Sequence, residues 1–315
     1  MKNKIWLIGA GPMALDYVKV VKDLDVEYLV IGRGEESASV FYNEAGIRPI
    51  TGGLDAFLQK NPVSCTHAIV AVGVELLAKT TIDLLNYGIE NILVEKPAGL
   101  NREEIEKVAR LTAEKGANVF VAYNRRFYAS VIRAKEIIEE DGGVTSFNFE
   151  FTEWAHTIEP LKKAPGVKEN WFLANSSHVV DLAFYLGGKP REISCYTAGG
   201  LSWHPSSSIF AGAGVSENGA LLSYQANWRA PGRWGIEILT KRHRLILRPL
   251  EKLHVQEIGS ITEVLVNIDD QKDIEHKPGL FHQTKSFIDH NYDLLIDISK
   301  QKEMMKYYNK ISGYV

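Results

Sequence analysis

Near the start of the chain stands the stretch Ile5-Trp6-Leu7-Ile8-Gly9-Ala10-Gly11-Pro12-Met13-Ala14, an apolar run that leads into the pattern Gly-x-Gly-x-x-Ala. Gly9 permits a tight turn, Gly11 lets the backbone approach a phosphate without a Cβ in the way, and Ala14 keeps the following helix close to the strand. A helix that begins here presents free N–H groups and a partial positive charge to an anion. The stretch predicts a dinucleotide site, with Gly9, Gly11, Pro12, Met13 and Ala14 as contacts; the alternative is a structural turn without a ligand.

The first 122 residues alternate short β-branched runs with helical stretches, which is the pattern of a parallel sheet covered by helices on both faces. We expect strands at 4–8, 26–31, 65–71, 90–94 and 117–121. We expect helices at 13–23, 35–45, 54–60, 75–87 and 101–115. The sequence therefore predicts an α/β fold whose N-terminal part, residues 1–122, is a doubly wound dinucleotide-binding domain of the Rossmann type.

The pattern changes after Tyr123. We expect a helix at 128–140, a strand at 145–154, a helix at 177–186, several strands between 192 and 267, and helices at 280–289 and 293–310. Glu217-Asn218-Gly219 is a hairpin signal, which favours an antiparallel sheet. Residues 123–315 are thus predicted to form an α+β domain on an open, mainly antiparallel sheet, with the loop 155–170 as a candidate mobile lid.

Composition excludes several classes of protein. The 315 residues are 45% apolar and carry a net charge of −3, so no electrostatic footprint for nucleic acid or an anionic membrane is present. No apolar run approaches the roughly 20 residues that span a bilayer, and no secretory leader precedes the first strand, so we expect a cytoplasmic protein. The two cysteines and the nine histidines show no ligand spacing, so we predict no metal.

Four motifs together resemble the Gfo/Idh/MocA family of oxidoreductases over essentially the whole chain. They are Gly9-Ala10-Gly11-Pro12-Met13-Ala14, Val94-Glu95-Lys96-Pro97, Tyr123-Asn124-Arg125-Arg126-Phe127 and His178-Val179-Val180-Asp181. The family joins a nucleotide-binding domain to an α/β domain built on an open sheet. The resemblance implies that Glu95 and Lys96 lie against the cofactor, that Lys96 is catalytic and that a cis peptide bond precedes Pro97.

The resemblance also implies a catalytic and substrate-binding role for His178. A lysine in a desolvated cleft and a histidine can both exchange a proton with a sugar hydroxyl near neutral pH, which suits this assignment. His178 and Asp181 are three positions apart and share one helix face. The further candidate substrate contacts are Asn124, Arg125, Trp171, Asn175 and Asp181.

One position departs from the family pattern. Many members carry an aspartate four residues before the histidine, where this chain has Ala174. The missing carboxylate leaves three alternatives open: Lys96 and His178 suffice, Asn175 only binds substrate, or redox activity is altered or lost.

The end of the second strand bears on the choice of cofactor. NAD-binding domains of this type usually offer an acidic residue to the ribose 2′-hydroxyl, whereas here the chain reads Ile31-Gly32-Arg33-Gly34. Arg33 suits a 2′-phosphate, so we expect NADP in preference to NAD, with Ser37 and Val72 as further contacts. Arg33 can instead stack on adenine, with Glu35 or Glu36 on the ribose.

The leading hypothesis is an NAD(P)-dependent oxidoreductase that transfers hydride between nicotinamide and a carbon of a sugar, polyol or nucleotide-linked sugar. The alternatives are a catalytically inactive, dinucleotide-responsive binding or regulatory protein and an NAD-dependent glycosidase of the same fold. We expect a small-molecule substrate and a homo-oligomer, a dimer or tetramer, formed through the sheet of the C-terminal domain.

Overall fold

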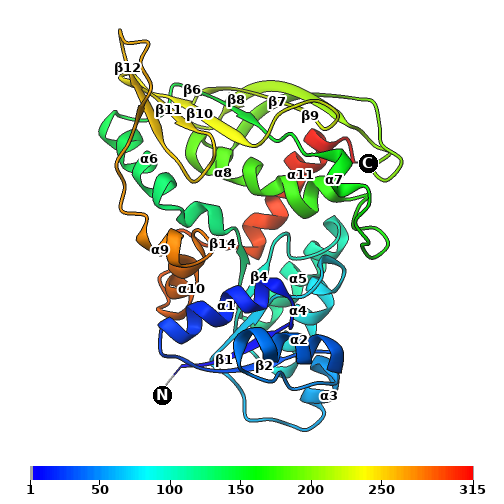
Figure 1. Cartoon of the computed structure of the whole chain (residues 1–315). Coiled ribbons are helices and arrows are strands. Elements are labelled where there is room, and N and C mark those ends of the chain that lie inside the picture. Colours follow the sequence, from blue (N-terminus) through cyan, green and yellow to red (C-terminus); the bar gives the residue numbers. More distant parts are fainter. Residues whose placement is uncertain (1–2, 315) are drawn as a thin grey trace. The chain divides into compact units, whose positions relative to one another are not determined.

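The structure of the protein, a computed structural model, describes residues 3–314 and divides into two compact units. The first unit comprises residues 3–123 and 275–304, and the second comprises residues 124–274 and 305–314 (Figure 1). The chain first crosses from the first unit to the second after Tyr123, next to the boundary expected from the sequence. Residues 275–304, however, return to the first unit. The division expected at 122/123 does not include this return.

The first unit contains a six-stranded sheet in the order β14-β5-β4-β3-β1-β2. Its strands are β1 (Lys4–Ile8), β2 (Glu27–Ile31), β3 (His67–Val70), β4 (Asn91–Glu95), β5 (Asn118–Ala122) and β14 (Ile296–Asp297). The first five are parallel, as predicted, and β14 joins β5 in the antiparallel sense. An isolated parallel bridge from Ile31 to Ile50 extends the sheet beyond β2. Strand order reverses at β1 and β3, which is where open α/β sheets bind ligands.

Six α-helices lie wholly within the described residues of this unit, and the five within the first 122 positions agree with the predicted ones to within a few residues. They are α1 (Pro12–Asp23), α2 (Glu35–Ala45), α3 (Gly53–Leu58), α4 (Leu77–Tyr87), α5 (Arg102–Lys115) and α10 (Leu280–Ile288). The start of α5 shows why the local sequence is decisive, since the Asn101 side chain accepts the Glu104 N–H at 3.0 Å. Helix α1 packs against α10, and α4 packs against α5.

The return of residues 275–304 has a clear packing cause. The buried Phe287 ring lies 5.0 Å from the His67 ring and 6.3 Å from the Phe120 ring, both on strands of the first sheet. The buried Gln301 donates to the Pro97 carbonyl and to the Tyr123 hydroxyl, each at 3.1 Å. The expected helix at 293–310 is wrong at its start, because β14 occupies residues 296–297 and α11 (Ile298–Ser312) begins after it.

The second unit contains an eight-stranded sheet in the order β13-β12-β11-β10-β6-β9-β8-β7. Its strands are β6 (Ser146–Glu150), β7 (Pro190–Ala198), β8 (Ile209–Ser216), β9 (Leu221–Asn227), β10 (Gly235–Leu239), β11 (His243–Leu247), β12 (His254–Glu257) and β13 (Val264–Leu265). All neighbours pair antiparallel except β6 and β9, so the prediction of an open, mainly antiparallel sheet is confirmed. The predicted hairpin at Gly219 joins β8 to β9.

Helices cover one face of this sheet: α8 (Ser177–Gly187) packs on β6 and β10, and α6 (Ala129–Glu140) packs on β11. Along β9, Leu222, Tyr224 and Ala226 are buried while the residues between them are exposed, which is the alternation of a sheet with one covered face. Two short helices, α7 (Ala155–Ile158) and α9 (Gln271–Glu275), complete the unit.

Strand β6 is shorter than the expected strand at 145–154. It ends at Glu150 because the chain turns away from the ladder: Trp228 Nε1 donates to the Phe151 carbonyl at 3.2 Å, and Thr152 Oγ1 accepts the Asn227 N–H at 3.3 Å. Residues 152–154 then lead into α7, inside the loop for which the sequence predicted a mobile lid.

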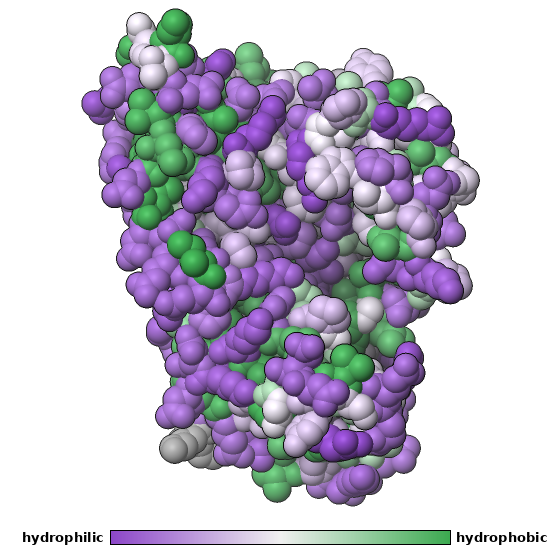
Figure 2. Space-filling model, viewed as in Figure 1, coloured by the Kyte–Doolittle hydropathy of each residue, from purple (hydrophilic) through white to green (hydrophobic). Residues whose placement is uncertain are grey.

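Apolar side chains are exposed on the hairpin that joins β12 to β13. Ile258, Ile261, Val264 and Leu265 are all exposed, and Figure 2 shows hydrophobic residues gathered at this hairpin. None of the helices in residues 3–314 has the length and apolar character needed to cross a membrane.

Candidate functional site

The turn after β1 is built so that only glycine fits at its first position. Gly9 has φ +126°, and a Cβ there would lie 2.2 Å from the Ala71 carbonyl oxygen. The Gly9 N–H donates to the Ile31 carbonyl at 2.8 Å, which holds the turn against β2. Gly9 therefore brings the ends of β1, β2 and β3 close together.

Gly11 meets a different situation. A Cβ on Gly11 would have no atom of the described residues within 4 Å, so the packing of the protein itself does not require glycine there. Gly11 lines a cavity of about 660 Å³ and lies directly before Pro12, the first residue of α1. An open approach to a helix N-terminus is what a pyrophosphate needs, so these residues fit a dinucleotide.

The cavity accounts for part of the predicted cofactor set. Gly9, Gly11, Arg33, Ser37 and Val72 line it. The remaining predicted contacts, Pro12, Met13, Ala14, Glu95 and Lys96, are not among its lining residues. Ala14 is fully buried beneath the turn, consistent with a packing role between helix and strand.

Acidic and basic side chains, among them Glu36, Asp55 and Lys79, line this cavity. Glu35 accepts from Arg48 at 2.8 Å and from the Thr51 hydroxyl. Those hydrogen bonds lower the pKa of Glu35 and occupy its carboxylate. Glu36 lines the cavity, so it is the better placed of the two acids that the sequence offered for the ribose.

Lys96 follows the last residue of β4, and the Lys96–Pro97 peptide bond is cis. Beside it, the Glu95 carboxylate accepts the Tyr17 hydroxyl at 2.8 Å. Burial raises the pKa of Glu95, while the charge of Lys96 opposes that rise. The Glu95 carboxyl therefore keeps its proton to a higher pH than an exposed glutamate does.

In the second unit, the two adjacent arginines have opposite environments. Arg126 forms a two-bond ion pair with Asp181 of α8, Nε to Oδ2 at 2.8 Å and Nη2 to Oδ1 at 2.6 Å. The Asp181 side chain is 2% exposed, so the ion pair with Arg126 fixes the orientation of the Asp181 carboxylate. Arg125 instead places its guanidinium 4.6 Å from the centre of the Trp234 ring.

A buried carboxylate, Glu153, organises the segment before α8. Residues Phe172–Ser176 form a turn of π-helix, a distortion often found at functional sites. Within it, Asn175 Nδ2 donates to Glu153 Oε1 at 2.9 Å and Ser176 Oγ donates to the same oxygen at 2.8 Å. Arg233 completes the cluster at 3.2 Å from Glu153 Oε2. Glu153 is 1% exposed.

Sequence reasoning missed Glu153. It expected a strand through 154, in which an acid is simply one solvent-facing position. One feature of the sequence could have indicated its burial. Glu153 is the only acid between Glu150 and Glu159, and it lies beside aromatic residues. The structure thus places the buried carboxylate of Glu153 beside Asn175. Asn175 directly follows Ala174, the position at which this chain lacks the aspartate of the family pattern.

His178 is buried near the start of α8, with its ring 6.4 Å from the Trp234 ring. Asn124 is also buried, in the helical turn after β5. Trp171 is buried and contacts Trp203 edge to face at 6.1 Å, which indicates a packing contribution in addition to any ligand contact. The second unit thus brings His178, Arg125 and Arg233 around Trp234. Glu153 is hydrogen-bonded to Arg233 and to Asn175.

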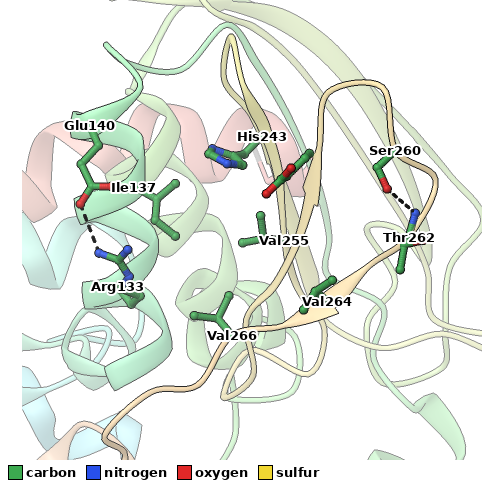
Figure 3. Close-up of a pocket in the computed structure, with 10 residues that line it drawn as sticks. Arg133, Ile137, Glu140, His243, Val255, Ser260, Thr262, Val264 and Val266 are labelled. Carbon is green, nitrogen blue, oxygen red and sulfur yellow. Dashed lines mark hydrogen bonds and ion pairs between the residues drawn. The ribbon is translucent and has the colours of Figure 1, made fainter.

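A second cavity, of about 480 Å³, lies between α6 and the β12–β13 hairpin (Figure 3). Valines 255, 264 and 266 line it opposite Arg133 and Ile137 of α6, and Arg133 pairs there with Glu140. It contains none of the predicted site residues.

One group of possible metal ligands occurs in the part of the chain that the structure describes, namely Asp23, Glu275 and His276, whose ligand atoms lie within 4.8 Å of one another. Asp23 and Glu275 are exposed, and His276 Nε2 lies 3.0 Å from Asp23 Oδ2. This contact is a hydrogen bond between the imidazole and the carboxylate, which needs no metal.

Comparison with known proteins identifies residues 3–123 of the first unit. Residues 3–123 match the model of the Gfo/Idh/MocA oxidoreductases, described as "Oxidoreductase family, NAD-binding Rossmann fold". Over residues 3–123 the resemblance found in the sequence is confirmed: these residues form an NAD(P)-binding Rossmann domain of the Gfo/Idh/MocA type. No curated protein matches the sequence.

Solved structures extend the likeness of fold to nearly the whole chain. Levoglucosan dehydrogenase in complex with NADH and L-sorbose has a TM-score of 0.80 at 17% identity, covering 99% of this chain and 96% of its own. A putative NADPH-dependent oxidoreductase from Desulfitobacterium hafniense has a TM-score of 0.80 at 16% identity, covering 100% and 96%. The WlbA dehydrogenase from Bordetella pertussis, in complex with NADH and UDP-GlcNAcA, has a TM-score of 0.76 at 16% identity, covering 99% and 95%.

Proposed function

We propose that this chain is an NAD(P)-dependent oxidoreductase that transfers hydride between nicotinamide and a hydroxyl-bearing or ketone carbon of a sugar, polyol or nucleotide-linked sugar. The observation that carries the proposal is the turn at Gly9 and Gly11, which is open toward a cavity of about 660 Å³ within a matching oxidoreductase domain. The sugar dehydrogenases among structures of the same fold support the substrate class.

In this proposal, residues 1–122 bind the cofactor and residues 123–315 bind the substrate. Gly9, Gly11, Pro12 and the start of α1 hold the pyrophosphate, and Arg33, Ser37 and Val72 contact the nucleoside. The nicotinamide, when bound, accepts or donates the hydride. All other work falls to side chains of the protein.

Lys96 and His178 exchange the hydroxyl proton with the substrate. Asn124, Arg125 and Asn175 hold the substrate, while the carboxylate of Asp181 is held by Arg126. Glu153 accepts the Asn175 amide N–H and so turns the carbonyl oxygen of that amide away from itself. This arrangement leaves the Asn175 oxygen to accept a substrate hydroxyl.

Replacement of Lys96 tests the function. Lys96→Ala should leave the affinity for NADH and NADPH within about twofold of the wild type and lower turnover by about 10²–10⁴-fold, the usual contribution of a general acid or base. Lys107→Ala, which removes an exposed lysine of α5, is the matched control. Unchanged turnover of Lys96→Ala on a sugar that the wild type oxidises would defeat the assignment.

A second function is favoured by Ala174, because that position lacks the carboxylate common in the family. A protein with this fold could bind NAD(P)H and respond to it without transferring hydride. Purified protein that binds the dinucleotide, yet reduces none across a panel of sugars and polyols, would favour this regulatory function. The buried Glu153 beside Asn175 weighs toward the enzyme.

A further inference from the structure

The charge of Arg125 has no anionic partner within 4 Å among residues 3–314. Its Nε atom is buried there and has no hydrogen-bond acceptor. The neighbouring Arg126, by contrast, satisfies its charge and two N–H groups on Asp181. Burying part of a guanidinium without an acceptor is unfavourable, so such a group is retained where a ligand supplies the acceptor.

Aromatic contacts hold Arg125 in place without using its N–H groups. Its guanidinium carbon lies 4.6 Å from the centre of the Trp234 ring and 5.9 Å from that of Tyr128. A cation over a ring is attracted to the π-face, and the in-plane N–H donors stay available. The stacking therefore positions the guanidinium but leaves the N–H donors at its edge available to a ligand.

Three charged side chains act on Arg125, one of them positive and two negative. Arg233 also lies 4.6 Å from the Trp234 ring. The negative charge of Glu153, which is hydrogen-bonded to Arg233, offsets the positive charge of Arg233. The other charge that acts on Arg125 is the exposed Glu251. Burial lowers the pKa of Arg125 and Arg233 acts in the same direction, whereas the negative charges of Glu251 and Glu153 oppose that change. An anion that accepted a hydrogen bond from the buried Nε atom would offset the cost of that burial.

We propose that Arg125 recognises an acidic group of the substrate, a carboxylate or a phosphoryl group, so that the preferred substrate is an anionic sugar derivative rather than a neutral sugar. A planar guanidinium offers parallel N–H donors to two oxygens of either group. His178 lies near the same Trp234 ring, so the acidic group and the reacting hydroxyl belong to one small molecule. This inference rests on the proposed function and narrows its substrate class.

Calorimetric titration of the full chain tests the inference with four probes: D-glucose, D-glucuronate, D-glucose 6-phosphate and UDP-glucose. We expect at least one acidic probe to bind about tenfold or more tightly than D-glucose, the usual gain from a charged hydrogen bond. Added salt should weaken binding of that probe alone. Whether glucuronate or a phosphorylated probe binds best separates carboxylate from phosphoryl recognition.

Two variants of Arg125 and one control locate the effect. Arg125→Gln should bind the acidic probe no more tightly than D-glucose, and Arg125→Lys should retain part of the preference. The control Arg191→Gln, which alters an exposed arginine of β7, should behave as the wild type. If Arg125→Gln unfolds, Arg125→Lys and the salt dependence of the wild type decide the question.

The inference is overturned if the wild type binds D-glucose as tightly as every acidic probe, or if Arg125→Gln keeps the preference. Hydride transfer to neutral sugars alone would sustain the proposed function and defeat the inference. Acidic-probe binding through Arg125 without any hydride transfer would sustain the inference and defeat the proposed function.

Discussion

At the scale of single residues, Arg125 and Arg126 show how little identity alone determines a role. Both are arginines in one helical turn, yet one is bound by a carboxylate with two hydrogen bonds and the other stacks on an indole. The sequence predicted that Arg125 contacts substrate, but the local residues do not show how its surroundings differ from those of Arg126. The distinction depends on Asp181 and Trp234, which lie 55 and 109 positions away from their respective partners.

Arg33 allows a direct prediction about the cofactor, because it lines the cavity at the end of β2. The wild type should bind NADPH more tightly than NADH. Arg33→Ala should lower the affinity for NADPH by about 10–100-fold, the loss of charged hydrogen bonds to a 2′-phosphate, and change NADH binding by less than about threefold. Fluorescence titration with both dinucleotides measures this. Arg102→Ala, an exposed arginine of α5, is the control, and equal affinities of the wild type would remove the case for NADP.

Glu153 yields a second prediction at this scale. Glu153→Gln removes the charged acceptor shared by Asn175 and Ser176, so the Asn175 amide should lose its fixed orientation. We expect kcat/KM to fall by about 10–100-fold, with unchanged affinity for the dinucleotide and a larger effect on KM than on kcat. Steady-state kinetics on the best substrate measures this split. The exposed Glu159→Gln is the control, and a variant that lost only thermal stability would make Glu153 purely structural.

At the scale of elements, the predictable parts are those whose signal is local. The first five strands and the helices up to residue 115 follow from periodic apolar patterns and from caps such as Asn101. Strand β14 has two residues and therefore no period, and it exists because Ile296 can pair with Val121. The π-helical turn at Phe172–Ser176 likewise has no pattern of its own. Both depend on contacts made by distant residues, which a local reading does not contain.

The junction between α6 and the β10–β11 turn gives a prediction about stability and pH. Asp141 ends α6, and its buried carboxylate accepts from Thr240 Oγ1 and pairs with His243 Nδ1, each at 2.7 Å. Although burial acts in the opposite direction, these hydrogen bonds lower the pKa of Asp141. The stabilisation is thus fully present above the ordinary carboxyl pKa of about 3.9 and is lost as the pH falls through the lower folded-state value.

Asp141→Asn should therefore lower the free energy of unfolding by about 1–3 kcal/mol at pH 7, the usual effect of removing charged hydrogen bonds. The difference from the wild type should shrink as the pH falls below about 4. Urea denaturation at pH 7 and across the acidic range measures both. Glu136→Gln, an exposed acid of the same helix, should show neither effect. A difference that stayed constant into acid would contradict the proposed charge dependence.

At the scale of the whole molecule, the sequence predicted two kinds of sheet and the point where the first domain ends. It did not predict that residues 275–304 return to the first unit, because that return is decided by the fit of Phe287 against His67 and Phe120. The same limit applies to the uncovered face of the second sheet. Alternation along β9 shows that a face is uncovered, and it does not show what that face meets.

We predict that two copies of the chain pair through this face. Tyr196 of β7 is 71% exposed and Leu221 of β9 is 61% exposed, and Tyr196 is opposite Ala211, which is opposite Gln225, in one row across the strands. Such a broad, mixed surface suits an interface of roughly 1,200–2,000 Å².

Light scattering should give twice the chain mass of 35.2 kDa, or a multiple of it. The double variant Tyr196→Arg, Leu221→Arg should give the mass of one chain, because burying two unpaired cations opposes association. Ile261→Arg, at the 95% exposed tip of the β12–β13 hairpin, should leave the assembly intact; dissociation of that variant alone would move the interface to the hairpin.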